Sequence, residues 1–217
     1  MIAQELASRG HALCTPDLPG HGRSATLTSD LWQTAELLAN TIDPSTIVGY
    51  SMGGRIALHL ALLRPNLVQR LVLIGATAGI EDNDDREARR ADDAELATRI
   101  EAIGVAAFLS EWLGGPLFAS LPASHAGSEH RLTNTTEGLA NSLRRCGTGS
   151  QALLWDRLSE IHCPVTLVVG GLDQKFTALA SRMQAVIGQN AELRIVDRAG
   201  HACHLEDPAR FLEVAFE

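Results

Sequence analysis

The strongest indication of fold class lies in residues 46–55, TIVGYSMGGR. An apolar run at residues 46–50 leads through Gly49-Tyr50-Ser51-Met52-Gly53 into a helical pattern that begins at Gly53. A G-x-S-x-G motif between a strand and a helix predicts a nucleophile elbow, in which a strained turn exposes a serine at a helix N-terminus. The glycines leave room for that turn. The alternative is a glycine-rich turn with an incidental serine, and the flanking strand and helix favour the elbow.

Outward from this motif, strand-like and helical patterns alternate. Strand-like runs, most of them rich in Val, Ile and Leu, lie at residues 11–15, 46–50, 70–75, 164–170 and 192–197. Helical patterns lie at residues 2–9, 31–42, 53–64, 178–187 and 208–216. Uninterrupted apolar strands are typical of a parallel sheet that is buried on both faces. The alternation therefore predicts an α/β fold with a mostly parallel, doubly wound sheet.

The middle of the chain has a different pattern. Residues 79–162 contain no strand-like run, are helical by pattern, and open with an acidic stretch at residues 81–101. We expect a helical cap there, inserted between two core segments at residues 1–78 and 163–217. The acidic side chains are expected on a solvated helix face.

A serine nucleophile requires a base, and the base requires an acid that orients it. Asp173 follows the apolar run at residues 164–170, and His201 follows the run at residues 192–197. The carboxyl ends of parallel strands meet at one edge of a sheet, so Ser51, Asp173 and His201 are predicted to converge there. His204 is the alternative base, and Asp197 is the alternative acid.

Two other groups of polar residues have structural interpretations. Metal-binding side-chain types cluster near the C-terminus at His201, Cys203, His204 and Glu206. At such close spacing they cannot share one face, so we expect no metal site. His21 belongs to a turn-rich loop, DLPGHGRS at residues 17–24, and is expected to be a hydrogen-bonded loop residue.

Composition excludes several classes of protein. The 217 residues are 45% hydrophobic and 20% charged, which excludes a disordered chain. The net charge of −8 argues against nucleic acid or an anionic membrane as the main partner, although a few converging arginines can still bind a small anion. The apolar runs are too short to span a bilayer. Without a secretory signal, we expect a cytoplasmic protein whose four cysteines are reduced thiols.

Several of these segments resemble a known family. The loop at residues 17–24, the Ser51 elbow, Asp173 and the Gly200-His201 pair resemble the α/β-hydrolase superfamily over nearly the whole chain. A narrower set is similar to the 2-succinyl-6-hydroxy-2,4-cyclohexadiene-1-carboxylate synthases of the menaquinone pathway. That set comprises residues 49–55, 116–121, 147–151 and 171–176, with Arg89, Trp112 and Trp155.

The narrower resemblance implies a lyase. Such an enzyme removes pyruvate from 2-succinyl-5-enolpyruvyl-6-hydroxy-3-cyclohexene-1-carboxylate without a metal or an organic cofactor. The resemblance further implies that His201, oriented by Asp173, deprotonates Ser51, and that the resulting alkoxide removes a ring proton. The Met52 N–H and Tyr50 would hold the negative charge that develops on the substrate.

The same resemblance implies how a small polycarboxylate would be bound. Arginine pairs with a carboxylate through two hydrogen bonds, and Arg55, Arg89 and Arg131 are the candidates by resemblance. For Arg89 and Arg131 the alternative is a solvated helix arginine. Trp112 would pack against the substrate ring.

The sequence departs from the family pattern at its start. The family has three strands, on the order of 30 residues, ahead of the helix that residues 2–9 resemble. The third of them lies between the strands that match residues 11–15 and 46–50, and its His-Gly loop normally supplies a second oxyanion donor. We expect the sequence to be a truncated record of a longer enzyme, with the start misassigned. A sheet closed by re-pairing and an edge supplied by a partner chain are the alternatives.

Two other functions stay open on the sequence. A serine ester or C–C bond hydrolase of the same fold would use the same serine, histidine and aspartate for acyl transfer. An inactive fragment or binding scaffold would keep the fold and lose the chemistry. The oligomeric state is not indicated by any pattern.

Overall fold

The computed structural model describes residues 2–216 and contains one parallel β-sheet. The strand order follows the chain order, and every neighbouring pair is parallel. The four strands are β1 (Ser45–Tyr50), β2 (Val68–Ile74), β3 (Val165–Gly170) and β4 (Ala191–Val196). Every residue of β3 is buried, which agrees with its uninterrupted apolar sequence.

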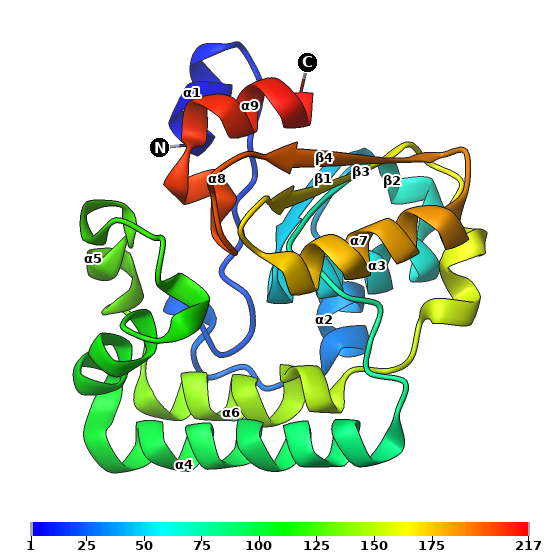
Figure 1. Ribbon diagram of the computed structural model, residues 1–217. Helices are drawn as coiled ribbons and strands as arrows, with labels where there is room; N and C mark the ends of the chain where they lie inside the picture. Colours follow the sequence, from blue (N-terminus) through cyan, green and yellow to red (C-terminus); the bar gives the residue numbers. More distant parts are fainter. Residues whose placement is uncertain (1, 217) are drawn as a thin grey trace.

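Helices cover both faces of this sheet, as Figure 1 shows. On one face the core joins β2 and β3 to α2 (Leu31–Ala39), α3 (Met52–Leu63) and α7 (Gln174–Ile187). On the other face, α1 (Ile2–Ser8) and α9 (Pro208–Phe216) pack together against the sheet. The predicted α/β fold with a doubly wound parallel sheet is confirmed.

The prediction of a strand at residues 11–15 is wrong. These residues are exposed and form no strand, and in the described chain β1 is hydrogen-bonded to β2 alone. A strand gains its backbone hydrogen bonds from a neighbour, and an apolar sequence without a neighbour does not form one. Re-pairing of residues 11–15 onto the free edge of β1 therefore does not occur among residues 2–216.

Between β2 and β3 the described chain contains helices and turns and no strand. We call residues 79–162 the cap. Its long helix α4 (Asn83–Leu113) is kinked at Gly104, which has φ 77°. Helix α6 (Thr136–Cys146) runs beside α4, and the four-residue helix α5 (Ser128–Arg131) precedes it (Figure 1).

Short 3-10 turns complete the chain. In the cap they lie at Pro116–Phe118, Ala123–His125, Thr148–Ser150 and Trp155–Glu160. Outside the cap they lie at Gly22–Ser24 and Pro65–Leu67, and the short helix α8 (Cys203–Glu206) leads into α9. Among residues 2–216, no helix combines the length and the apolar character that crossing a membrane requires.

The acidic stretch at the start of the cap is solvated with one exception. Glu81, Asp84 and Glu95 are exposed, as expected for a solvated helix face. Asp93 is 1% exposed and points into the interior. Burial of a carboxylate is costly unless hydrogen-bond donors surround it, so Asp93 needs such donors within the protein.

Candidate active site

The predicted elbow is present between β1 and α3. Ser51 has φ 49° and ψ −108°, a left-handed conformation that is strained for a residue with a side chain. Its N–H donates to Ile74 O at 2.8 Å, which fixes the turn against β2. The turn places Ser51 directly before the first residue of α3, where backbone N–H groups have no acceptor within the helix.

The glycines of this turn differ in their importance. A Cβ on Gly49 would lie 2.5 Å from Gly53 O, and one on Gly54 would lie 2.7 Å from Ala76 Cβ. A Cβ on Gly53 would meet nothing within 4 Å. Room for the turn is therefore needed at Gly49 in the motif and at Gly54 just beyond it, and the expectation that Gly53 provides it is wrong.

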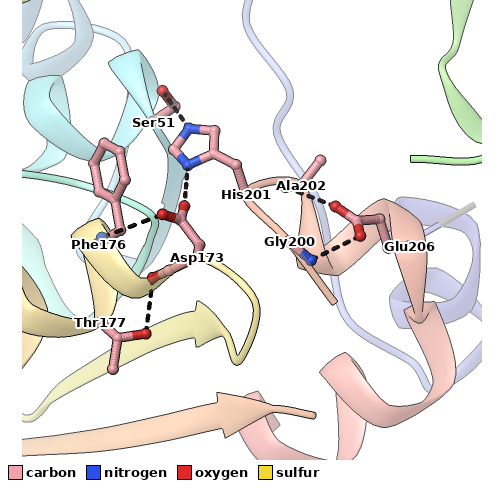
Figure 2. A network of polar contacts seen from close by, with 8 residues as sticks. All are labelled: Ser51, Asp173, Phe176, Thr177, Gly200, His201, Ala202 and Glu206. Carbon is pink, nitrogen blue, oxygen red and sulfur yellow. Dashed lines mark hydrogen bonds and ion pairs between the residues drawn. The ribbon is translucent and has the colours of Figure 1, made fainter. Parts of the chain in front are cut away.

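Ser51, His201 and Asp173 form one hydrogen-bonded chain, shown in Figure 2. His201 Nδ1 lies 2.8 Å from Asp173 Oδ2, and His201 Nε2 lies 3.2 Å from Ser51 Oγ. With Nδ1 donating to the carboxylate, Nε2 is the acceptor for the serine hydroxyl. His201 is 4% exposed and its ring packs against Phe176, 4.5 Å between centroids.

Asp173 is itself held in place. It is the N-cap of α7, and its Oδ1 accepts a hydrogen bond from Phe176 N at 3.2 Å. One carboxylate oxygen thus caps a helix while the other faces His201. A serine, an imidazole and a carboxylate in this order are the groups that nucleophilic or general-base catalysis by serine requires.

The alternatives to these residues lie elsewhere. The ring of His204 packs at a tilt against that of Tyr50, with 4.3 Å between centroids, and His201 is the histidine whose ring nitrogen contacts Ser51. Burial, with His201 and Arg131 nearby, lowers the pKa of His204 to about 4. Asp197 is exposed just beyond the end of β4. Among residues 2–216 no three His, Cys, Asp or Glu side chains are grouped so as to hold a metal ion.

A cavity of about 430 Å³ opens in front of Ser51 between the core and the cap. The core contributes Ser51 and His201, and Asp173 lies behind His201, outside the lining. Apolar side chains of the cap form much of the wall, namely Leu96, Ile100, Phe108, Leu109, Leu117, Phe118, Leu139 and Leu143. The site residues predicted by resemblance also line it, namely Tyr50, Met52, Arg55, Arg89, Trp112 and Arg131.

Three arginines face this cavity from different elements. Arg55, on α3, is 7% exposed and donates to Cys146 O at 2.6 Å, and burial lowers its pKa to about 10. Arg89, on α4, donates through Nε to Asp93 at 2.8 Å. Arg131, on α5, donates through Nε to Ala126 O at 2.8 Å, and burial lowers its pKa. All three are thus fixed by protein acceptors and still border the cavity.

Met52 and Tyr50, two of the predicted site residues, each carry a hydrogen-bond donor that faces no acceptor in its own element. Met52 is the first residue of α3, so its N–H has no acceptor in the helix. The hydroxyl of Tyr50 is buried and has no hydrogen-bond partner in the described part of the chain. Burial raises the pKa of Tyr50, so the phenol keeps its proton and remains a donor. Trp112 lies under Arg131, whose Cζ is 5.5 Å from the ring centroid.

Sequence reasoning missed polar residues that line the cavity, among them Asp93, Asn134 and Ser142. Asp93 accepts from Arg89 and from Gly149 N at 3.1 Å, and it lies at helical spacing before the buried Ala97 and Ile100, a signal that could have found it. Asn134 accepts from Gly22 N at 2.9 Å and donates to Arg131 O at 2.9 Å. No sequence pattern indicates Asn134. His21, expected to be a hydrogen-bonded loop residue, lies 3.2 Å from Pro19 O through Nδ1.

Comparison with known proteins gives consistent matches over nearly the whole chain. The sequence profile of the Alpha/beta hydrolase family matches residues 2–214. A Bacillus subtilis (strain 168) protein provisionally named 2-succinyl-6-hydroxy-2,4-cyclohexadiene-1-carboxylate synthase is 35% identical, over 93% of this chain and 75% of that protein. The synthase of that name from Serratia proteamaculans (strain 568) is 32% identical, over 90% of this chain and 78% of the relative.

A solved structure is also similar. The structure of MenH from S. aureus aligns with a TM-score of 0.83 and 32% sequence identity, over 90% of this chain and 78% of that one. The chain therefore spans about three quarters of the length of these relatives, and the similarity extends across both the core and the cap.

Proposed function

Because this chain belongs to the alpha/beta hydrolase family, and within it to the group of 2-succinyl-6-hydroxy-2,4-cyclohexadiene-1-carboxylate synthases, we propose that it eliminates pyruvate from 2-succinyl-5-enolpyruvyl-6-hydroxy-3-cyclohexene-1-carboxylate. The products are pyruvate and 2-succinyl-6-hydroxy-2,4-cyclohexadiene-1-carboxylate. The cytoplasmic location expected from the sequence stays a prediction.

One observation carries this proposal. Arg55, Arg89 and Arg131 come from three helices and line the cavity that contains Ser51. Three fixed guanidinium groups can form ion pairs with the carboxylates of a polycarboxylate substrate. A simple ester has no negative charge with which they could pair. The aromatic and aliphatic remainder of the wall is suited to a cyclohexene ring, and Trp112 is its largest side chain.

The proposed mechanism uses Ser51 as a base. His201, oriented by Asp173, accepts the hydroxyl proton of Ser51, and the alkoxide removes a proton from the substrate ring. The electron pair of the broken C–H bond forms a ring double bond to the neighbouring carbon, the pair of the existing ring double bond moves one position along the ring, and the C–O bond to the enolpyruvyl group breaks. That group leaves as the enolate of pyruvate and takes up a proton. The N–H of Met52 and the hydroxyl of Tyr50 stabilise the charge that develops on the substrate carboxylate.

The test is pyruvate release from the enolpyruvyl substrate by the wild-type chain and by Ser51→Ala. Wild-type release that falls by roughly 10³-fold or more in Ser51→Ala supports the proposal. Arg89→Gln should raise KM by roughly tenfold, because one carboxylate partner is lost. Arg99→Gln is the matched control, since Arg99 lies on the same helix, is half-exposed, and pairs with Glu111 away from the cavity.

Two results would contradict the proposal. Turnover of simple aryl esters through a trapped acyl-enzyme, with Arg89→Gln unaffected and no pyruvate released, would identify a serine hydrolase. Binding of the substrate with no release of pyruvate would identify a scaffold.

A further inference from the structure

The loop that carries His201 lacks regular secondary structure. It connects β4 to α8, and Gly200, His201 and Ala202 are all buried. No strand pairs with this loop among residues 2–216, so its buried backbone N–H groups need other acceptors. Helix α8 has only four residues and cannot by itself define where the loop lies.

Glu206 supplies those acceptors. Its Oε2 accepts from Gly200 N at 2.7 Å, and its Oε1 accepts from Ala202 N at 3.1 Å (Figure 2). The two amides are those of the residues directly before and after His201. Within the described chain, Glu206 is the acceptor found for each of them. One carboxylate therefore fixes the backbone on both sides of the histidine.

From this geometry we propose that Glu206 is a positioning residue, which holds His201 at hydrogen-bond distance from Ser51 and Asp173. The inference rests on the proposed role of those three residues. His201 must meet two partners at once, at 2.8 Å and 3.2 Å, and its ring can do so only if its Cα and Cβ are fixed. A displacement of about 1 Å at a reacting group commonly lowers a rate by about 10²-fold.

The chemistry requires a carboxylate at position 206. Two N–H donors approach two different oxygens, and a carboxylate offers an acceptor at each. Glutamine has nearly the same shape but presents one carbonyl oxygen and one NH₂ group. The NH₂ group would face an N–H donor, so Glu206→Gln keeps one hydrogen bond and replaces the other by a repulsive contact.

The test compares wild type, Glu206→Gln and Glu213→Gln. Glu213, on α9, is half-exposed and pairs with Arg210, so its variant removes the same charge without touching the loop. The first readout is the proton NMR signal of the hydrogen-bonded His201 Nδ1–H. We expect this signal in wild type and in Glu213→Gln, and its broadening or loss in Glu206→Gln.

The second readout is the kinetics of pyruvate release. In Glu206→Gln, kcat should fall by roughly 10- to 100-fold while KM changes by less than about twofold, because the arginines that bind substrate are untouched. If Glu206→Gln does not fold, Glu206→Asp carries the test. It keeps the charge, is one methylene shorter, reaches only one amide, and should show a smaller loss in kcat.

Failure of this inference and failure of the proposed function give different results. A wild-type His201 signal and unchanged kcat in Glu206→Gln would overturn the positioning role and leave the proposed reaction intact. If wild type releases no pyruvate, the reaction is wrong, and the NMR comparison alone still decides whether Glu206 positions His201.

Discussion

His204 lies near His201, the histidine that contacts Ser51, and is surrounded by aromatic rings. Its ring packs between Tyr50 and Phe211, with centroid distances of 4.3 Å and 6.0 Å. Its Nδ1 is buried without a hydrogen-bond partner in the described chain. Burial next to His201 and Arg131 disfavours the charged ring, which is why its pKa is about 4.

This lowered pKa predicts a pH dependence of stability. Above about pH 6.5, His204 is neutral in both the folded and the unfolded chain and contributes no slope. Between about pH 6.5 and the folded pKa of about 4, only the unfolded chain binds the proton, so the free energy of unfolding falls as the pH falls. His204→Phe keeps an aromatic ring and should remove on the order of 2 kcal/mol of that loss.

The measurement is urea unfolding at several pH values between about 7 and 4. His21 and His59 also have pKa values lowered by burial, so some slope remains in His204→Phe. The difference between the two proteins isolates His204, and His162→Phe, at an exposed position, is the control. Equal slopes in wild type and His204→Phe would contradict the prediction.

At the residue scale, the convergence of Ser51, Asp173 and His201 could be predicted because each follows a recognisable strand in a fixed order. Asp93, Asn134 and Glu206 could not be predicted in the same way. Their roles depend on which backbone amides and arginines lie within hydrogen-bond distance after folding. The contact between Arg89 and Asp93 can be inferred from sequence, because the two residues are four positions apart on one helix. The contact between Asn134 and Gly22 cannot, because the two are far apart in the chain.

At the scale of one element, the turn between β1 and α3 leads to opposite predictions for two of its glycines. Gly49→Ala would place a Cβ 2.7 Å from Gly54 Cα, which is backbone and cannot move aside. We expect it to lower the free energy of unfolding by about 1–3 kcal/mol. Gly53→Ala adds a methyl group in open space within α3 and should raise the free energy of unfolding by about 0.5–1 kcal/mol.

Denaturant unfolding of the two variants at one pH measures both effects. Each substitution adds the same methyl group within the same motif, so each serves as the control for the other. Equal stability in Gly49→Ala and Gly53→Ala would show that close packing does not determine which glycine the turn needs.

The elements themselves show what composition can and cannot predict. The apolar runs that became β2 and β3 are recognisable because both of their faces are buried. The run at residues 11–15, HALCT, has one Leu and no Val or Ile, and it stays exposed coil because no neighbouring strand pairs with it. Val48 on β1 is 44% exposed, since no described element covers that part of the sheet.

At the scale of the whole molecule, the cavity depends on how the cap meets the core. The loop at residues 17–24 contacts the start of α6, and Asn134 accepts from Gly22 N at 2.9 Å across this boundary. The same asparagine donates to Arg131 O, so the contact also places an arginine of the cavity. The helical character of the cap could be predicted, but this contact could not, because it joins residues more than 100 positions apart.

Gly138, in the first turn of α6, lies in close backbone contact with the core. A Cβ there would lie 2.9 Å from Ala25 O and closer still to Gly20 O. Because both are backbone atoms, Gly138→Ala should push the cap away from the loop and shift Arg131 out of the cavity. We expect KM for the enolpyruvyl substrate to rise by roughly tenfold and the free energy of unfolding to fall by about 1–3 kcal/mol.

Steady-state pyruvate release and urea unfolding test this prediction together. Arg145→Ala is the matched control, because it places the same methyl side chain on an exposed position of the same helix. It should leave KM unchanged, since Arg145 does not line the cavity. A Gly138→Ala protein with wild-type KM would mean that the cap can move away from the loop without moving Arg131, and the contact through Asn134 would then have no part in substrate binding.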